Sequence, residues 1–282
     1  MAEVIDMPPE PAAAAGDPAE AEPNVIRAAK QVPKRRYRLT IAYDGTDFHG
    51  WQKQHPPDGE PLRTVQEVVE GVLKELLWQR IHLVGASRTD AGVHAMGQSA
   101  QFDAKCPIPL ERLPMAINSR LPEDVEVRAA EVAPPKFDAI NAVTSKQYRY
   151  RIWNSVHRPL TLRHVAWHCW YDLDVDLMND AARRLVGMHD FAGLAYAKHG
   201  RKSTIRTIHA CEVVRAGDEV QIVVSGDGFL YNMVRILAGT LVEVGRGLFN
   251  PARIDLILSE ADRRLAGPTL PPQGLCLEWV RY

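Results

Sequence analysis

The sequence predicts an α+β protein built from two similar, α/β-sandwich-like halves, each with a mainly antiparallel sheet. Segments in which apolar and polar residues alternate, as in half-buried strands, recur along residues 34–282. Only a few segments with helical spacing separate them, and this mixture occurs on both sides of Pro134-Pro135. The chain has 282 residues, enough for one large domain or two ordinary ones.

Three regions are expected along the chain. Residues 1–33 are rich in Ala, Pro and Glu without any apolar period, which predicts a disordered acidic tail. Residues 34–135 form the N-terminal half, and residues 136–282 form the C-terminal half. The charges are uneven, because residues 1–30 have a net charge of −4 and the remaining residues +3. A mildly basic body is compatible with a polyanionic partner but does not demand one.

The N-terminal half is expected to begin with a strand over residues 37–43, because Tyr37, Leu39 and Ile41 alternate with less apolar residues. Thr64 and Glu67 have the spacing of a capping box ahead of apolar residues at helical spacing, which predicts a helix over residues 64–77. The further expected elements are a strand at 81–84, an extended segment at 98–102, a helix at 110–119 and a strand at 125–132.

The C-terminal half is expected to begin with a strand in which Tyr148, Tyr150 and Ile152 alternate with polar residues. A helix over residues 174–186 has Asp174 or Asp176 as its cap. The remaining expected elements are paired strands at 205–215 and 219–225, an apolar helix at 230–244 ending at Gly245, a helix starting at Asn250-Pro251, and a strand at 275–282.

Composition excludes several classes of protein. No apolar run approaches the roughly 18 residues of a membrane helix, so no membrane partner is expected. The N-terminus lacks the pattern of a secretory signal, and Cys106, Cys169, Cys211 and Cys276 have no CxxC spacing, which favours reduced thiols in the cytoplasm. No glycine-rich loop follows a strand and opens a helix, so nucleotide triphosphates and dinucleotides are disfavoured as substrates. No cofactor is expected.

Two short motifs favour structural interpretations. Tyr43-Asp44-Gly45-Thr46 is similar to the nucleophile loop of aspartate-dependent phosphohydrolases, but Ala42 stands where the second carboxylate is needed, so a turn is favoured. His164, His168 and Cys169 are residue types found in zinc sites, but further ligands are not evident. A strand with packed histidines is favoured there, and no metal site is expected.

The segment from Gly85 to His94 concentrates polar chemistry in one loop between strands. It contains Ser87, Arg88, Thr89 and Asp90 between glycines, and such loops are common places for active sites. A carboxylate beside an arginine can stay ionised when partly desolvated, as a nucleophile requires. The residues alone leave two interpretations open: a catalytic carboxylate, or a polar turn with a surface arginine.

Arg88-Thr89-Asp90-Ala91-Gly92-Val93-His94 resembles the catalytic-loop signature of the tRNA pseudouridine synthase A family. Five further segments resemble parts of the same family, in family order across residues 37–282. They are Ile41 to Gln52, Thr64-Val65-Gln66-Glu67, Lys146-Gln147-Tyr148-Arg149-Tyr150, Asp227 to Arg246, and Ala266-Gly267-Pro268-Thr269 with Gln273-Gly274-Leu275. Any one match has little weight, but the ordered set is highly specific.

The resemblance implies a pseudouridine synthase fold with a central RNA-binding cleft, and a cytoplasmic homodimer. It also implies conversion of uridine to pseudouridine in the anticodon stem-loop of tRNA, at tRNA positions 38, 39 and 40, without a cofactor. Asp90 is the implied catalytic nucleophile or base. Among the substrate-binding residues, Tyr148 stacks on the target base, Arg235 pairs with Asp90 and holds it ionised, and Arg88 helps to displace the base from its stack.

One residue departs from the family pattern: Ser87 stands where the family usually has Gly. A serine fits there only if the backbone avoids positive φ or tolerates it at some cost. Several basic residues elsewhere are candidates for phosphate contacts, such as Lys34, Arg35, Arg36, Arg149, Arg151, Arg201 and Lys202. The run Lys34-Arg35-Arg36 fits a solvated surface segment equally well. Two other hypotheses are a non-catalytic RNA-binding module and a metal-dependent hydrolase that uses His164 and His168.

Overall fold

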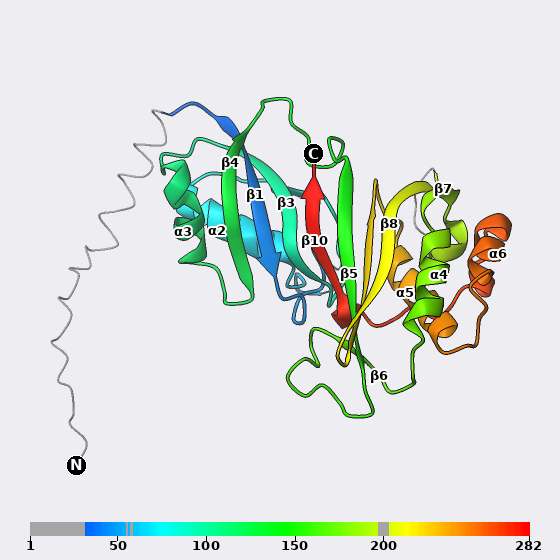
Figure 1. The fold of residues 1–282 in the computed structure, drawn as a ribbon. Helices are drawn as coiled ribbons and strands as arrows, with labels where there is room; N and C mark the ends of the chain where they lie inside the picture. Colours follow the sequence, from blue (N-terminus) through cyan, green and yellow to red (C-terminus); the bar gives the residue numbers. More distant parts are fainter. Residues whose placement is uncertain (1–31, 55, 57–58, 197–202) are drawn as a thin grey trace, which may run out of the picture.

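One sheet of ten strands runs through the computed structural model, which describes residues 32–54, 56, 59–196 and 203–282. Its main path is β4-β1-β3-β10-β5-β9-β8-β7, while β2 pairs with β3 and β6 pairs with β5. Figure 1 shows the strands of the two sequence halves on either side of β10. The predicted tail lies almost entirely outside the described residues.

The N-terminal half contributes four strands: β1 (Arg35–Tyr43), β2 (Val84–Gly85), β3 (His94–Ala104) and β4 (Val125–Ala133). β1 lies between β3 and β4 and is antiparallel to both. Its predicted alternation is confirmed, because Tyr37, Leu39 and Ile41 are buried. The helices are α2 (Val65–Leu77) and α3 (Leu113–Asn118), which follows a 3-10 turn at Leu110–Arg112. In Figure 1 α2 crosses behind β1 and β3.

The C-terminal half contributes β5 (Ser145–Asn154), β6 (Trp167–Cys169), β7 (Gly187–Asp190), β8 (Ile205–Ala216) and β9 (Glu219–Gly226). Its helices are α4 (Val175–Arg184), α5 (Met233–Gly245) and α6 (Arg253–Glu260), and 3-10 turns occur at Ala192–Leu194, Arg263–Leu265 and Pro272–Gly274. Asp174 is the cap of α4, since its side chain accepts a hydrogen bond from the Leu177 amide at 3.0 Å. Among the described residues, no helix has the length and apolar character needed to cross a bilayer.

The strand β10 (Leu275–Arg281) joins the two halves. It is parallel to β3, with Cys276 opposite His94, and antiparallel to β5, with Leu277 opposite Tyr148. Leu275 and Leu277 are buried in a core that contains side chains from both halves. The closing strand predicted at residues 275–282 is therefore the strand through which the two halves become one sheet.

The predicted start of α2 is confirmed, but the predicted capping box is wrong. Thr64 precedes the helix with no side-chain cap hydrogen bond, and its buried Oγ1 has no partner. Instead, the amides of Val65 and Gln66 donate to the carbonyl oxygens of Gly50 and Trp51, at 3.2 and 3.0 Å. The free donors of the first helical turn are thus satisfied by another loop.

Three other predicted boundaries are corrected. The strand predicted at 81–84 is reduced to Val84–Gly85, because the Leu83 amide and carbonyl bond to side chains of α2 instead of a neighbouring strand. The apolar helix begins at Met233, because Asn232 has a φ of 59°, outside the helical region. The helix α6 begins at Arg253, because the Asn250 side chain accepts from the Ala252 amide and holds residues 250–252 in a turn.

Candidate active site

A cavity of about 590 Å³ lies where segments from the two halves meet. The loop after β2 forms one wall, β5 contributes Lys146 and Tyr148, and the segment that leads into α5 forms the other wall. The lining residues are Gly85 to Asp90, Val93, Ile140, Lys146, Tyr148, Phe229 to Arg235 and Leu275. All four predicted site residues therefore line one cavity.

The loop that carries Asp90 is held from behind by residues 43–51. The Trp51 amide donates to the Thr89 carbonyl at 3.1 Å, and the Tyr43 hydroxyl and Thr89 Oγ1 share a hydrogen bond of 2.8 Å. Gly50 has a φ of 86°, and a Cβ there would be 2.6 Å from the Thr89 carbonyl oxygen, so a larger residue does not fit. Residues 43–51 thus build a rigid support for Asp90.

The Asp44-Gly45 motif belongs to this support. The Asp44 side chain accepts a hydrogen bond from the Thr46 amide at 3.0 Å, and the Gly45 amide donates to His94 Nδ1 at 3.0 Å. These are contacts of a turn, as the sequence predicts.

Asp90 and Arg235 meet across the cavity. Arg235 Nη1 is 3.3 Å from Asp90 Oδ2, and it also donates to Asn232 Oδ1 at 2.8 Å. Arg235 Nε donates to the Leu270 carbonyl at 2.7 Å. The guanidinium is therefore fixed by two neutral acceptors, and it makes one long contact with the carboxylate. The positive φ of Asn232 brings its amide oxygen to this position, which sequence periodicity does not reveal.

Burial raises the pKa of Asp90 above the ordinary aspartate range, and the nearby charge and hydrogen bond of Arg235 oppose this shift only in part. The Asp90 side chain is 23% exposed, so the cavity removes most of the water that stabilises its charge. An incompletely stabilised carboxylate at the edge of a cavity is the state expected of a reacting group rather than of a structural ion pair.

Tyr148 projects into the same cavity from β5. Its hydroxyl and Ser87 Oγ are 2.8 Å apart and share a hydrogen bond. Its ring packs edge-on against Phe229, with ring centroids 5.2 Å apart. Burial raises the pKa of Tyr148 to about 12, so the side chain is a neutral phenol near pH 7. The ring and its hydroxyl are therefore fixed from two sides.

Ser87 satisfies the condition set by the sequence, because its φ is not positive. The Ser87 amide donates to Gln98 Oε1 at 3.2 Å, and Gln98 Nε2 donates to the Ser87 carbonyl at 2.6 Å. This pair of bonds keeps the loop extended beside β3, where a side chain is accommodated. Arg88, the next residue, has an exposed side chain and lines the cavity.

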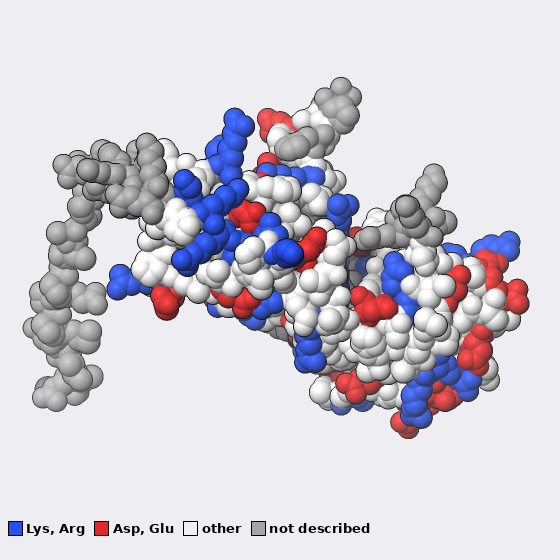
Figure 2. Space-filling view, turned by 90° about the horizontal axis from the view of Figure 1, so that it is seen from above, with Lys and Arg blue, Asp and Glu red and all other residues white. Residues whose placement is uncertain are grey.

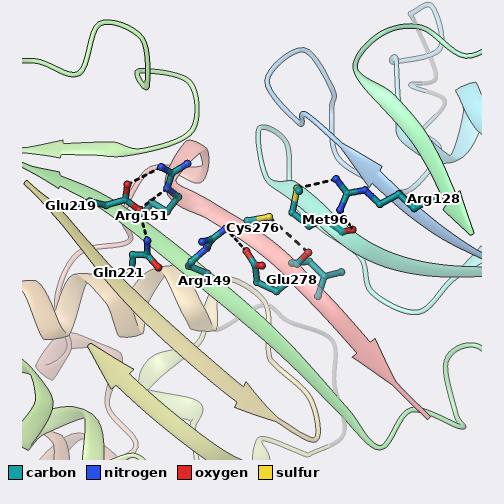
Figure 3. A network of polar contacts seen from close by, with 9 residues as sticks. Met96, Arg128, Arg149, Arg151, Glu219, Gln221, Cys276 and Glu278 are labelled. Carbon is teal, nitrogen blue, oxygen red and sulfur yellow. Dashed lines mark hydrogen bonds and ion pairs between the residues drawn. The ribbon is translucent and has the colours of Figure 1, made fainter. Parts of the chain in front are cut away.

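The basic residues predicted to contact phosphates have different surroundings in the structure, since some form ion pairs and others are exposed. Arg149 and Arg151 point to the face of β5 opposite Tyr148, where they pair with Glu278 and Glu219, both at 2.8 Å (Figure 3). Arg36 pairs with Asp103, while Lys34 and Arg35 are exposed. Figure 2 shows blue side chains gathered on the N-terminal half. Arg201 and Lys202 lie outside the described residues.

The histidines considered for zinc have other surroundings. The ring nitrogen Nε2 of His168 is 2.8 Å from the Ser155 carbonyl oxygen, and its ring lies 5.9 Å from that of Trp170. In the part of the chain that the structure describes, no three His, Cys, Asp or Glu side chains are grouped as metal ligands. The strand interpretation is confirmed for His168, which lies in β6, and is wrong for His164, which is exposed in the turn before β6.

Sequence reasoning missed several residues of the cavity, and three of them contact residues described above. Lys146, Phe229 and Asn232 line it, and their contacts with Ser87, Tyr148 and Arg235 shape the site. All three lie inside segments that carry the family resemblance, but the resemblance assigns them no role. Only their positions in space indicate one.

Both halves of the chain match a known family. A family model described as tRNA pseudouridine synthase matches the chain twice, over residues 39–140 and 181–282. The chain belongs to this family. The double match confirms the predicted similarity of the two halves, and family membership confirms the prediction of an isomerase. Asp90 lies in the first matched segment and Arg235 in the second, so residues of both segments line the cavity.

Several relatives are similar over nearly their whole length, and each is named tRNA pseudouridine synthase A. The protein of Caldicellulosiruptor bescii is 41% identical over 248 residues, covering 88% of this chain and all of the relative. That of Geobacter sulfurreducens is 44% identical with the same coverage. That of Anoxybacillus flavithermus is 44% identical over 249 residues, covering 88% of this chain and 99% of the relative.

Proposed function

We propose that the enzyme converts uridine to pseudouridine in the anticodon stem-loop of tRNA, at tRNA positions 38, 39 and 40, with Asp90 as the nucleophile. The observation that carries this proposal is the meeting of Asp90, Arg235 and Tyr148 in one cavity of about 590 Å³. The cavity is large enough for a nucleotide turned out of its helix.

Asp90 starts the reaction as an ionised carboxylate. The glycosidic bond between ribose C1′ and uracil N1 breaks, the uracil turns, and a bond forms between C1′ and C5. The C5 proton leaves and N1 gains a proton, so no group is gained or lost. Burial of Asp90 makes its charge reactive, and Arg235 keeps enough of it ionised.

Tyr148 and Arg88 handle the base. Tyr148 stacks on the turned-out uracil and assists the proton transfer at C5, because its hydroxyl is fixed by Ser87, a residue of the loop that carries Asp90. Arg88, exposed at the cavity, helps to displace the uridine from its stack, since the glycosidic bond is not accessible inside a paired stem.

The enzyme works in the cytoplasm as a homodimer, in which one tRNA contacts both subunits. A body with a net charge of only +3 outside residues 1–30 then binds a large polyanion by sharing it between two protomers. Exposed basic residues of the N-terminal half, such as Lys34 and Arg35, contribute phosphate contacts.

The test is incubation with unmodified tRNA, followed by chemical mapping of pseudouridine. Wild type modifies uridines of the anticodon stem-loop, and tRNA with cytidine at these positions receives no label. Asp90→Asn binds tRNA but loses turnover by at least roughly a thousandfold. Asp103→Asn is the matched control, because it breaks an Asp–Arg pair outside the cavity and retains activity. Binding without any modification by wild type would instead establish a non-catalytic RNA-binding module.

A further inference from the structure

Beside the Asp90–Arg235 pair, a second polar arrangement reaches the cavity and ends on the Tyr148 hydroxyl. Ser87 Oγ lies 2.8 Å from that hydroxyl, and Lys146 Nζ donates to Ser87 Oγ at 3.3 Å. Lys146 Nζ also donates to the Ala86 carbonyl at 2.7 Å. Three side chains from the catalytic loop and β5 therefore form one chain of contacts from a cation to a phenol.

Ser87 is held in place independently of Tyr148. Its amide and carbonyl both bond to the side chain of Gln98, which is fully buried on β3. Ser87 itself is 8% exposed, so water has little access to its hydroxyl. A buried hydroxyl on a fixed backbone defines a position for whatever it binds, and here it binds Tyr148.

The ammonium group of Lys146 polarises the Ser87 hydroxyl in a defined direction. Lys146 is a donor only, so it occupies one acceptor position of Ser87 Oγ. This contact makes the Ser87 hydroxyl a better donor toward the Tyr148 oxygen, because hydrogen bonds in a chain strengthen one another. The hydrogen bond from Ser87 stabilises the ionised form of Tyr148, and it opposes the effect of burial on the pKa of that phenol.

We infer that Ser87 is a positioning residue that, together with Lys146, fixes and polarises the Tyr148 hydroxyl for proton transfer during uridine isomerisation. The inference rests on the proposed function, because it assumes that the cavity holds the reacting uridine. A glycine at position 87 has no group to take this part, so the serine supplies a contact that its backbone alone does not.

The first test compares single-turnover rates and tRNA binding for Ser87→Ala and Ser99→Ala. Ser99 is a matched control, because it is buried and accepts a hydrogen bond of 2.8 Å from another tyrosine, Tyr282. Loss of one hydrogen bond that acts on the reacting group lowers the rate by about tenfold. Ser87→Ala shows this loss with binding within twofold, Ser87→Gly matches it, and Ser99→Ala keeps the wild-type rate.

The second test needs no tRNA. A fluorinated tyrosine is placed at position 148 by codon suppression, and its ionisation is followed by fluorine NMR as pH rises. Ser87→Ala removes a donor to the phenolate, so the midpoint rises by about 0.7 pH unit. Lys146→Met raises it in the same direction, and the two changes together shift it by less than their sum. Ser99→Ala leaves the midpoint unchanged.

The outcomes separate this inference from the proposed function. If wild type makes no pseudouridine, the function fails, and the NMR midpoints still decide whether Ser87 acts on Tyr148. If wild type is active and Ser87→Ala keeps both the wild-type rate and the wild-type ionisation midpoint of Tyr148, the positioning role is wrong. A tenfold loss of rate with no change of midpoint also overturns it, since Ser87 then acts through something other than the phenol.

Discussion

Two arginine–carboxylate pairs lie on opposite faces of the central sheet, Arg151–Glu219 and Arg235–Asp90. They differ in how completely the arginine satisfies the carboxylate. On the face of β5 opposite Tyr148, Arg151 holds Glu219 through two hydrogen bonds of 2.8 Å, and Gln221 adds a third at 2.6 Å (Figure 3). In the cavity, Arg235 touches Asp90 once, at 3.3 Å. Its other hydrogen bonds go to the neutral oxygens of Asn232 and Leu270.

The pKa values of the two carboxyl groups shift in opposite directions. Hydrogen bonding to Arg151 lowers the pKa of Glu219, whereas burial raises the pKa of Asp90 despite Arg235. A carboxylate with its oxygens satisfied is stable and unreactive, and one that is buried with a single distant partner retains reactivity. The difference lies in the number of contacts, because both pairs join an arginine to an acid.

Exchanging the arginine in each pair gives the largest expected contrast. Arg235→Leu lowers the turnover of pseudouridine formation by about a hundredfold, because Asp90 loses the charge that keeps it ionised. Arg151→Leu changes turnover less than about threefold, because it lies on the other face of β5. Single-turnover assays on unmodified tRNA measure both. Equal losses in the two variants would show that the faces are not functionally distinct.

The dependence of turnover on pH in the acidic range also distinguishes the Arg235–Asp90 pair from the Arg151–Glu219 pair. Turnover needs ionised Asp90, whose pKa is raised, so activity is full above that pKa and is lost as pH falls through it. The loss therefore begins at a higher pH than for an ordinary aspartate. In Arg235→Leu the profile moves further to high pH, since only burial remains, whereas Glu219→Gln leaves it in place. An unmoved profile in Arg235→Leu contradicts the pairing.

The free energy of unfolding is expected to depend more on the Arg151–Glu219 pair than on the Arg235–Asp90 pair. Glu219→Gln lowers the free energy of unfolding at pH 7 by about 1–3 kcal/mol, because Arg151 loses its charged partner. The lowered pKa of Glu219 means that its contribution is present above the unfolded-state pKa and is lost as pH falls through the folded-state pKa. Denaturant unfolding of wild type and variant should converge at low pH, and a constant difference would count against the pair.

The smallest expected effect is a gain. Because the folded-state pKa of Asp90 is raised, its ionised form destabilises the fold at pH values above that pKa. Asp90→Asn removes this charge and raises the free energy of unfolding at pH 7 by up to about 1 kcal/mol, at the cost of activity. The gain over wild type grows as pH rises through the raised pKa. A loss of stability at every pH would mean that Asp90 is a structural partner of Arg235.

Local patterns predicted the elements that satisfy their own hydrogen bonds. The apolar spacing of α2 and the alternation of β5 are confirmed, and alternation alone places Tyr148 and Arg149 on opposite faces. Prediction failed where backbone amides and carbonyls form hydrogen bonds with groups outside their own helix or strand. Leu83 bonds to side chains of α2 instead of a strand, and the first amides of α2 bond to Gly50 and Trp51.

The site shows the same division. Asp90 was recognisable from a polar loop and a family resemblance. Its pairing with Arg235, 145 positions further along the chain, is confirmed, but only the resemblance predicted it and no local pattern did. No periodicity links Ser87 with Tyr148, which are 61 positions apart and meet only because β3 and β5 flank β10. For Arg149 and Arg151, charge alone suggested phosphate contacts. The sequence did not reveal that both side chains are paired with acidic residues, Glu278 and Glu219.

The central position of β10 in the sheet has a consequence for the order in which the protein is synthesised and folds. Residues 275–281 are made after every other described strand, yet they separate β3 from β5 in the finished sheet, and Leu275 lines the cavity. Such distant pairing forms late in folding. Until β10 is made, the nascent chain lacks the strand that lies between β3 and β5 and one residue that lines the cavity. In an enzyme that modifies tRNA, the cavity can therefore be completed only after tRNAs have decoded the codons of β10.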